Sequence, residues 1–203
     1  MRKEEWLESL EAMLVFAIPL LLAIPFYILG LLDQPSANVI VYSLYIVLSI
    51  AVTKHNRRTL GEIGITRAQL LPCLGNSVVL VLASLATRYM GADLRLSPDL
   101  SSWQAVVYNL FFWSLSGTGQ EIVFRGLILF SLDRWKGWKV ALTVSSVLFG
   151  LVHLLRYPSL LAMALEIILG VAWGWMTLNY RNVLGPIVAH SLFNFMFSFA
   201  LIS

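Results

Sequence analysis

Seven apolar segments, most of them close to twenty residues long, constrain the fold of this chain more than any other feature. They cover about residues 13–32, 38–53, 70–90, 103–133, 139–156, 158–180 and 183–202. A helix rises 1.5 Å per residue, so about twenty apolar residues cross roughly 30 Å of bilayer hydrocarbon. Polar turns such as Asp33-Gln34-Pro35-Ser36 separate the segments. We therefore expect an all-α fold, a polytopic bundle of about seven transmembrane helices.

The composition supports an integral membrane protein with a single domain. Of the 203 residues, 59% are hydrophobic and 12% are charged, a balance that leaves too little polar surface for a water-soluble domain of this size. Because the turns are short, we expect residues 1–203 to form one integral membrane domain. The only cysteine, Cys73, excludes an internal disulfide. The net charge of +3 comes from basic residues in short turns, so nucleic acid is not an expected partner.

Basic residues are distributed unequally between the two sides of the predicted bundle. Ten of the fourteen lie on the side of the N-terminus, three lie on the other side, and Arg125 lies within a span. The positive-inside rule then predicts a cytoplasmic N-terminus and an external C-terminus. Ahead of the first span, residues 3–12 are predicted to form a short amphipathic helix with Trp6, Leu7 and Leu10 facing lipid. The ten residues are Arg2, Lys3, Lys54, Arg57, Arg58, Arg67, Arg134, Lys136, Lys139 and Arg181, against Arg88, Arg95 and Arg156.

Polar residues inside the predicted spans occur in pairs four residues apart. Glu121 and Arg125 lie one helical turn apart, in the order that favours an ion pair. His190 and Asn194 share one helix face and are expected to point into one cavity. His153 lies four residues after Phe149, whose ring is expected beside the imidazole. Charged and polar groups at membrane depth are costly, and three spans that each offer such a pair indicate a common functional site.

The sequences Q-E-I-V-F-R-G (120–126), F-G-L-V-H (149–153) and H-S-L-F-N (190–194) resemble three motifs of one known family. These motifs are E-E-x-x-x-R, F-x-x-x-H and H-x-x-x-N of the CPBP or Abi family, the glutamic-type intramembrane endopeptidases that include the CAAX prenyl endopeptidase. The resemblance runs from about residue 59 to the C-terminus, with a motif-bearing core at about 100–203.

The resemblance implies a site and a division of roles within it. A glutamate at position 120 would activate a water together with His153, and His190 and Asn194 would stabilise the oxyanion. Glu121 with Arg125 would orient the site. This chain has Gln120 at the first position, and an amide cannot take up a proton. We therefore expect the chain to bind its substrate without cutting it. An engineered Glu-to-Gln inactivation competes with a natural non-catalytic member, and the presence of all other motif residues favours the first.

Three other functions compete with proteolysis by a glutamate. Two histidines and a carboxylate can bind zinc, but the chain has no H-E-x-x-H and Arg125 disfavours a cation, so we expect no cofactor, with a divalent metal as the alternative. A membrane peptide-binding or bacteriocin-immunity protein would use the same cavity without catalysis. A transporter is disfavoured because no internal repeat is visible.

The resemblance also implies the partners and the location. The expected substrate is a membrane-embedded or lipidated protein tail cleaved near its C-terminus, with removal of a sorting helix as the leading expectation. The chain's small size suits a multi-pass protein of a prokaryotic cell membrane. Glu166, in the sixth span, belongs to none of the motifs, and we expect a protonated core carboxyl in preference to a substrate contact.

Overall fold

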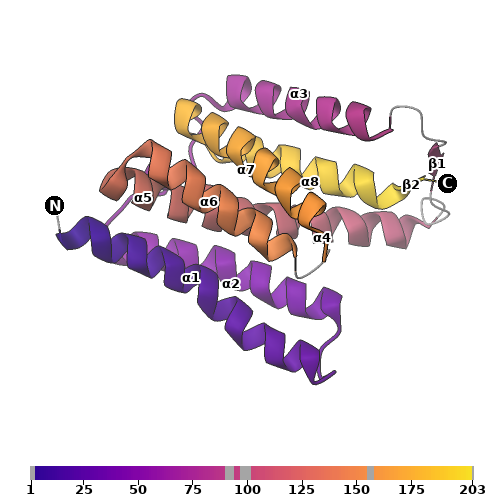
Figure 1. The fold of residues 1–203 in the computed structure, drawn as a ribbon, viewed down its shortest axis with the longest axis horizontal. Coiled ribbons are helices and arrows are strands. Elements are labelled where there is room, and N and C mark those ends of the chain that lie inside the picture. The colour runs from indigo at the N-terminus through magenta and orange to yellow at the C-terminus, as the bar shows by residue number, and fades with distance from the viewer. Residues whose placement is uncertain (1–2, 90–93, 97–101, 155–157, 203) are drawn as a thin grey trace.

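The chain folds into a bundle of helices that alternate in direction (Figure 1). The structure is a computed structural model that describes residues 3–89, 94–96, 102–154 and 158–202. The predicted all-α fold is confirmed, with one pair of very short strands in addition. The elements are α1 (Lys3–Ile28), α2 (Gln34–His55), η1 (Leu60–Ile63), α3 (Leu70–Tyr89), β1 (Leu94–Leu96), α4 (Trp103–Glu121), η3 (Ile122–Ile128), α5 (Leu129–Lys136), α6 (Trp138–His153), α7 (Leu160–Tyr180), α8 (Leu184–Phe199) and β2 (Ala200–Ile202).

The helices begin and end close to the predicted turns because the turn residues supply the caps. The side chain of Asp33 accepts a hydrogen bond from the backbone N–H of Ser36 at 2.8 Å and so caps α2. Ser102 and Ser159 accept equivalent bonds at the starts of α4 and α7. Gly137, with φ of 83°, separates α5 from α6, a backbone conformation that glycine adopts without strain. Arg156 and Tyr157, between α6 and α7, lie outside the described residues, as does Arg2.

Among the described residues, three helices, α1, α2 and α7, are long and apolar enough to cross a membrane. Shorter apolar helices run over Leu70–Leu85, Trp138–His153 and Leu184–Ser198. The predicted fourth segment is one continuous helical stretch in which α4, η3 and α5 follow one another. These lengths fit an integral membrane protein, and the number of spans and their orientation stay predictions.

The prediction of a separate N-terminal helix was wrong. Residues 3–28 form one continuous helix, although Trp6, Leu7 and Leu10 are exposed as expected. The reason lies on the opposite face of the first turns of α1, where Glu8 is only 8% exposed. Its carboxylate accepts hydrogen bonds from Arg58 at 2.9 Å and from Arg134 at 2.8 Å. These contacts hold the start of α1 against the bundle, where an interfacial helix would lie away from it.

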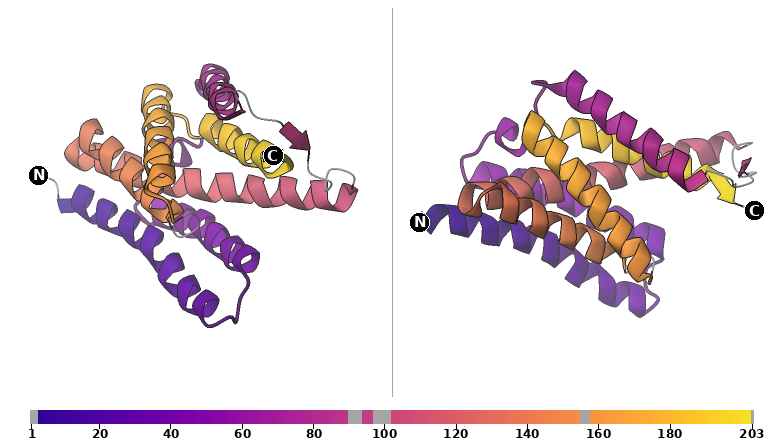
Figure 2. Two further views of the ribbon diagram at one scale, coloured as in Figure 1. Left: turned by 45° about the vertical axis from the view of Figure 1, so that its right-hand side comes forward. Right: turned by 45° about the horizontal axis from the view of Figure 1, so that its top comes forward.

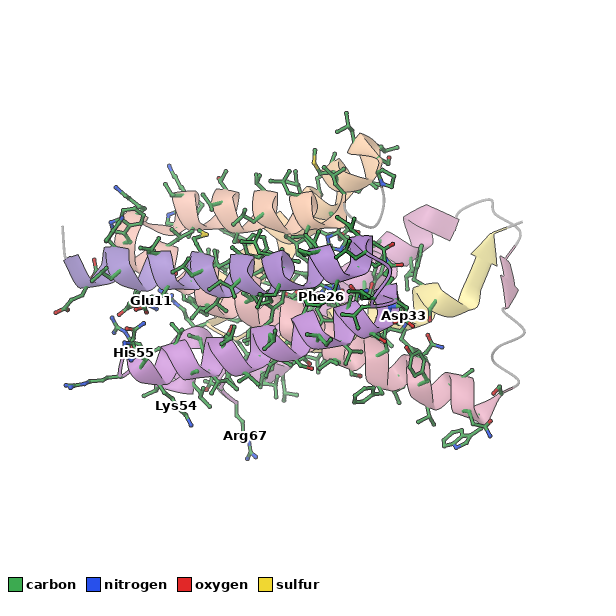
Figure 3. All side chains as sticks on the ribbon, turned by 90° about the horizontal axis from the view of Figure 1, so that it is seen from below. Glu11, Phe26, Asp33, Lys54, His55 and Arg67 are labelled. Carbon is green, nitrogen blue, oxygen red and sulfur yellow. The ribbon has the colours of Figure 1, made fainter. Side chains whose placement is uncertain are left out.

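The same end of the bundle gathers several loops. Besides the Glu8 contacts, Asn56 donates to Glu11 at 2.6 Å, and Arg181 donates to Asp133 at 3.0 Å. Figure 3 shows Glu11, Lys54 and His55 at one end of the α1–α2 hairpin and Asp33 at the other. The loops predicted to carry the basic residues therefore do lie together.

β1 and β2 pair antiparallel, with Leu94 opposite Ile202 and Leu96 opposite Ala200. The predicted seventh segment, 183–202, therefore ends as helix at Phe199. This pairing joins the chain before α4 to the end of α8 (Figure 1). It lies at the opposite end of the bundle from the start of α1 (Figure 1).

The π-helical segment η3 lies at the centre of the fold. Its seven residues are all buried, and it packs against α1, α2, α6, α7 and η1. At its end the backbone N–H of Leu129 donates to Phe124, five residues earlier. In both views of Figure 2 the α1–α2 hairpin and α3 lie on opposite sides of this centre. Short π-helical stretches inside α-helices often occur at functional sites.

Candidate active site

Glu121 of the first motif lies in a buried cluster with Arg125 of the same motif and His190 of the third motif. Glu121 and Arg125, at the junction of α4 with η3, are both 0% exposed, and Arg125 Nη1 lies 3.3 Å from Glu121 Oε1. The same oxygen lies 2.7 Å from Nδ1 of His190 on α8. A carboxylate beside a guanidinium accepts hydrogen bonds, so His190 donates from Nδ1. Its other ring nitrogen, Nε2, takes no part in this bond. This cluster joins the first and third motifs.

Phe149, the aromatic residue of the second motif, lies at the centre of the three motifs. Its ring centroid is 4.0 Å from the guanidinium carbon of Arg125, 4.6 Å from the ring of His153 and 5.7 Å from the ring of His190. An arginine over an aromatic face is held by cation–π attraction, which strengthens when water is excluded. The predicted contact of Phe149 with His153 is therefore present, and the same ring also supports the buried cluster.

Trp173 on α7 completes the apolar wall of this cluster. Its ring stacks on His190 with centroids 4.9 Å apart and an angle of 26° between the planes. It also lies 5.9 Å from the guanidinium carbon of Arg125. Trp173 is 1% exposed. Sequence reasoning missed this residue, because one tryptophan among the seven in the chain carries no signal of its own.

A cavity of about 730 Å³ lies beside the buried cluster, between α1, α2, α4, α6, α7 and α8. Most of its walls are apolar. Four of the motif and candidate side chains line it, namely Gln120, His153, Asn194 and Glu166. A mostly apolar cavity with a few convergent polar groups is the usual form of a site for a ligand or substrate. The structure thus brings three motif residues and Glu166 to one cavity, while Glu121 and Arg125 lie buried beside it.

Gln120 is held within its own helix. Its Nε2 donates to the hydroxyl of Ser116 at 2.9 Å, and Ser116 lines the same cavity. A glutamate in this position would accept a hydrogen bond from the same hydroxyl, so Ser116 suits either side chain. Ser116 was not predicted, although its four-residue spacing from Gln120 is the same signal that marked the other pairs.

The tautomer of His153 follows from its backbone partner. Nδ1 lies 2.8 Å from the carbonyl oxygen of Phe149, and because a carbonyl only accepts, Nδ1 carries the proton and donates. In the neutral ring Nε2 is then a free base. Nε2 lies 3.8 Å from Oε2 of Glu166, whose side chain is 23% exposed against 15% for His153. Glu166 therefore lies at the cavity wall and is partly exposed, so its predicted place in the core was wrong.

The third motif is divided between the two parts of the site. Asn194 lines the cavity, whereas His190 is not among the lining residues and bonds to Glu121. The expectation that both side chains point into one cavity is not met in this arrangement. The reason is the Glu121 carboxylate, which takes the near nitrogen of His190 into the buried cluster.

Two glycines of α4 lie where helices pack closely. A Cβ built on Gly117 would lie 2.9 Å from the backbone nitrogen of Ser191, and one built on Gly119 would lie 2.8 Å from the carbonyl oxygen of Tyr42. These glycines let α4 approach α8 and α2 closely.

Among the described residues, no three His, Cys, Asp or Glu side chains group as a metal site.

The fold and the site together define a helical integral membrane protein with a buried Glu–Arg–His cluster beside a cavity that holds a free histidine base. Residues 102–196 match the model of the family described as type II CAAX prenyl endopeptidase Rce1-like. This part of the chain carries all three motifs, and the match agrees with the resemblance that the motifs indicated. No curated protein and no solved structure matches the chain. This match supports a CAAX-type intramembrane protease function.

Proposed function

We propose that this protein is a glutamic-type intramembrane endopeptidase that hydrolyses a peptide bond near the C-terminus of a membrane-embedded or lipidated protein. The observation that carries this proposal is the cavity of about 730 Å³ lined by Gln120, His153 and Asn194. It offers a base at His153 Nε2 and an amide at Asn194 that can donate to a developing oxyanion. The apolar walls suit a lipid chain or an apolar tail.

The buried cluster has a supporting role in this proposal. Arg125 neutralises Glu121, and Glu121 fixes the orientation and tautomer of His190. Residues that bond to the side chains of a site in this way hold those side chains in their productive orientation. We assign the direct contact with the substrate oxyanion to Asn194, and we assign to His190 a position behind it.

Gln120 lowers the activity in this proposal. General bases contribute about 10²–10⁴-fold to a rate, and an amide cannot serve as one. The chain with Gln120 is therefore expected to bind substrate well and to cleave it at least about 10²-fold more slowly than the Gln120→Glu variant. The setting is the cell membrane of a prokaryote, with a lipidated or membrane-spanning protein tail as substrate.

The test is cleavage by Gln120→Glu in detergent micelles. The probes are a quenched-fluorescent peptide with a farnesylated cysteine four residues from its C-terminus, and a peptide that ends in an apolar helix. The expected result is cleavage of at least one probe, detected by mass spectrometry, and loss of that cleavage in Gln120→Glu/His153→Ala. A folded Gln120→Glu variant that cleaves neither probe contradicts the proposal.

A second function is favoured by one observation, the glutamine at position 120. A peptide-binding or immunity protein needs the cavity and its polar groups without a base. In that case Gln120→Glu would bind the probes as tightly as the unchanged chain does and release no product. Binding measured by fluorescence anisotropy beside the cleavage assay separates the two functions.

A further inference from the structure

Glu166 is a carboxylate in the cavity that none of the three motifs contains. It lies on α7, and its Oε2 is 3.8 Å from Nε2 of His153 on α6. Both side chains line the cavity and are partly exposed in it. The chain therefore has an acidic group beside its histidine base, although it has an amide at position 120.

The contact between Glu166 and His153 is too long for a direct hydrogen bond. A direct hydrogen bond between nitrogen and oxygen needs about 2.7–3.2 Å, and 3.8 Å exceeds this range. In the described part of the chain, Glu166 accepts no hydrogen bond from a protein group either. The buried pair of Glu121 with His190, at 2.7 Å, shows what a closed contact in this protein looks like.

The separation does suit a water molecule bonded to both groups. A water about 2.8 Å from each atom fits between an oxygen and a nitrogen 3.8 Å apart. His153 Nδ1 is already committed to the carbonyl of Phe149, so Nε2 can accept one proton of that water. Glu166 Oε2 can accept the other. A water with both protons bonded to acceptors is activated for attack on a carbonyl carbon.

Resting on the proposed endopeptidase function, we propose that Glu166 is a catalytic carboxylate in this chain and supplies the base that position 120 lacks. The oxygen of the held water bonds to the carbonyl carbon of the substrate, and Glu166 takes the proton that this water loses. The C–N bond then breaks, and the same proton passes to the departing nitrogen. The products are a carboxylic acid and an amine, and Glu166 is a carboxylate again.

This role fits what the structure shows of Gln120 and Asn194. The amide of Gln120 is bonded to Ser116 and lines the cavity, so it can hold the substrate or the water by hydrogen bonds without a change of protonation. Asn194 lines the cavity from α8 and can donate to the oxyanion. The residual cleavage by the unchanged chain is then the cleavage through Glu166.

The test compares four forms of the full chain on the farnesylated probe in micelles: unchanged, Glu166→Gln, Gln120→Glu, and the double variant Glu166→Gln/Gln120→Glu. The unchanged chain is expected to cleave slowly but above the level of protein-free micelles. Glu166→Gln is expected to lower that rate about 10²–10⁴-fold. The double variant is expected to cleave again, because a glutamate at 120 restores a base. Glu166→Asp, which keeps the carboxylate, is expected to lose less than Glu166→Gln.

Two controls separate chemistry from folding. Glu4→Gln removes an exposed carboxylate at the start of α1 and is expected to leave the rate unchanged. Elution from size exclusion and thermal unfolding are expected to be the same for Glu166→Gln and the unchanged chain.

The outcomes distinguish this inference from the proposed function. If Gln120→Glu cleaves while the unchanged chain does not exceed protein-free micelles, or if Glu166→Gln keeps the unchanged rate, Glu166 is not a catalytic carboxylate and the endopeptidase function stands. If none of the four forms cleaves, both proposals are overturned.

Discussion

The buried pair of Glu121 and Arg125 gives the sharpest prediction for stability. Both side chains are 0% exposed and 3.3 Å apart, and the guanidinium of Arg125 also lies over the ring of Phe149. Removing one partner of a buried ion pair leaves an uncompensated charge, which costs about 3–5 kcal/mol. We expect Glu121→Gln to lower the free energy of unfolding by this amount.

The chain offers a matched control for this prediction. Arg58 and Glu62 have the same four-residue spacing and a shorter separation, 3.0 Å, but their side chains are 32% and 40% exposed. An exposed pair of this kind contributes about 0.3–0.5 kcal/mol. Glu62→Gln also keeps the capping box of η1, because glutamine serves there as well as glutamate does. The effect at position 121 is thus expected to be several times that at position 62, in spite of the longer distance.

The assay is equilibrium unfolding in mixed micelles of a mild detergent and SDS, followed by tryptophan fluorescence. The double variant Glu121→Gln/Arg125→Met removes both charges and is expected to recover at least half of the loss, since methionine packs on Phe149 in place of the guanidinium. Two results would refute the reasoning. One is a loss at position 121 no larger than the loss at position 62, and the other is a double variant whose loss equals the sum of the two single losses.

Three further predictions concern packing, hydrogen bonding and pH. Gly117→Ala is expected to cost about 1–3 kcal/mol, because its Cβ would press on the backbone of Ser191, while Gly75→Ala, with nothing within 4 Å, is expected not to destabilise; both are measured by the same unfolding assay. Asn182→Leu is expected to cost at least about 1–3 kcal/mol, since Asn182 donates to Thr66 and Ala68 and accepts from Leu184, and amide exchange between α7 and α8 should rise with it. The backbone N–H of Thr59, with help from Arg58, lowers the pKa of Glu62. The contribution of Glu62 to the free energy of unfolding is therefore complete at neutral pH, and it is lost as the pH falls from the ordinary glutamate pKa through the lowered pKa of the folded protein. Glu62→Gln should remove this step from a plot of melting temperature against pH, and an unchanged step would assign it to another group.

Much of the fold was predictable because hydrophobic segments in a bilayer have few alternatives to helices. The predicted segments agree with the observed helices to within a few residues, except at the N-terminus, where Glu8 holds α1 to the bundle. That error was unavoidable from local pattern alone, because the partners Arg58 and Arg134 lie far away along the chain. The prediction of helix at residues 200–202 was wrong for a similar reason, because pairing with residues 94–96 decides their conformation.

The candidate site was predictable in membership but not in arrangement. Four-residue spacings show which side chains share a helix face, and they identified the pair of Glu121 with Arg125. They do not show how helices are turned toward each other. The division of His190 from Asn194, and the approach of Glu166 to His153, depend on that rotation. A single acidic residue inside an otherwise apolar segment was the available signal for Glu166.

The π-helical segment also sets an angular phase between the two halves of one long helix. Each of its hydrogen bonds spans one residue more than an α-helical bond does, so the segment turns less per residue, and the direction in which α5 presents its side chains depends on how many residues lie between Glu121 and Leu129. An α-helical stretch of the same seven residues would turn α5 farther relative to α4 and would move the buried Leu129 and Phe130 away from the side on which they pack. The number of residues in this stretch and its hydrogen-bond pattern therefore decide together which side chains of α5 enter the core.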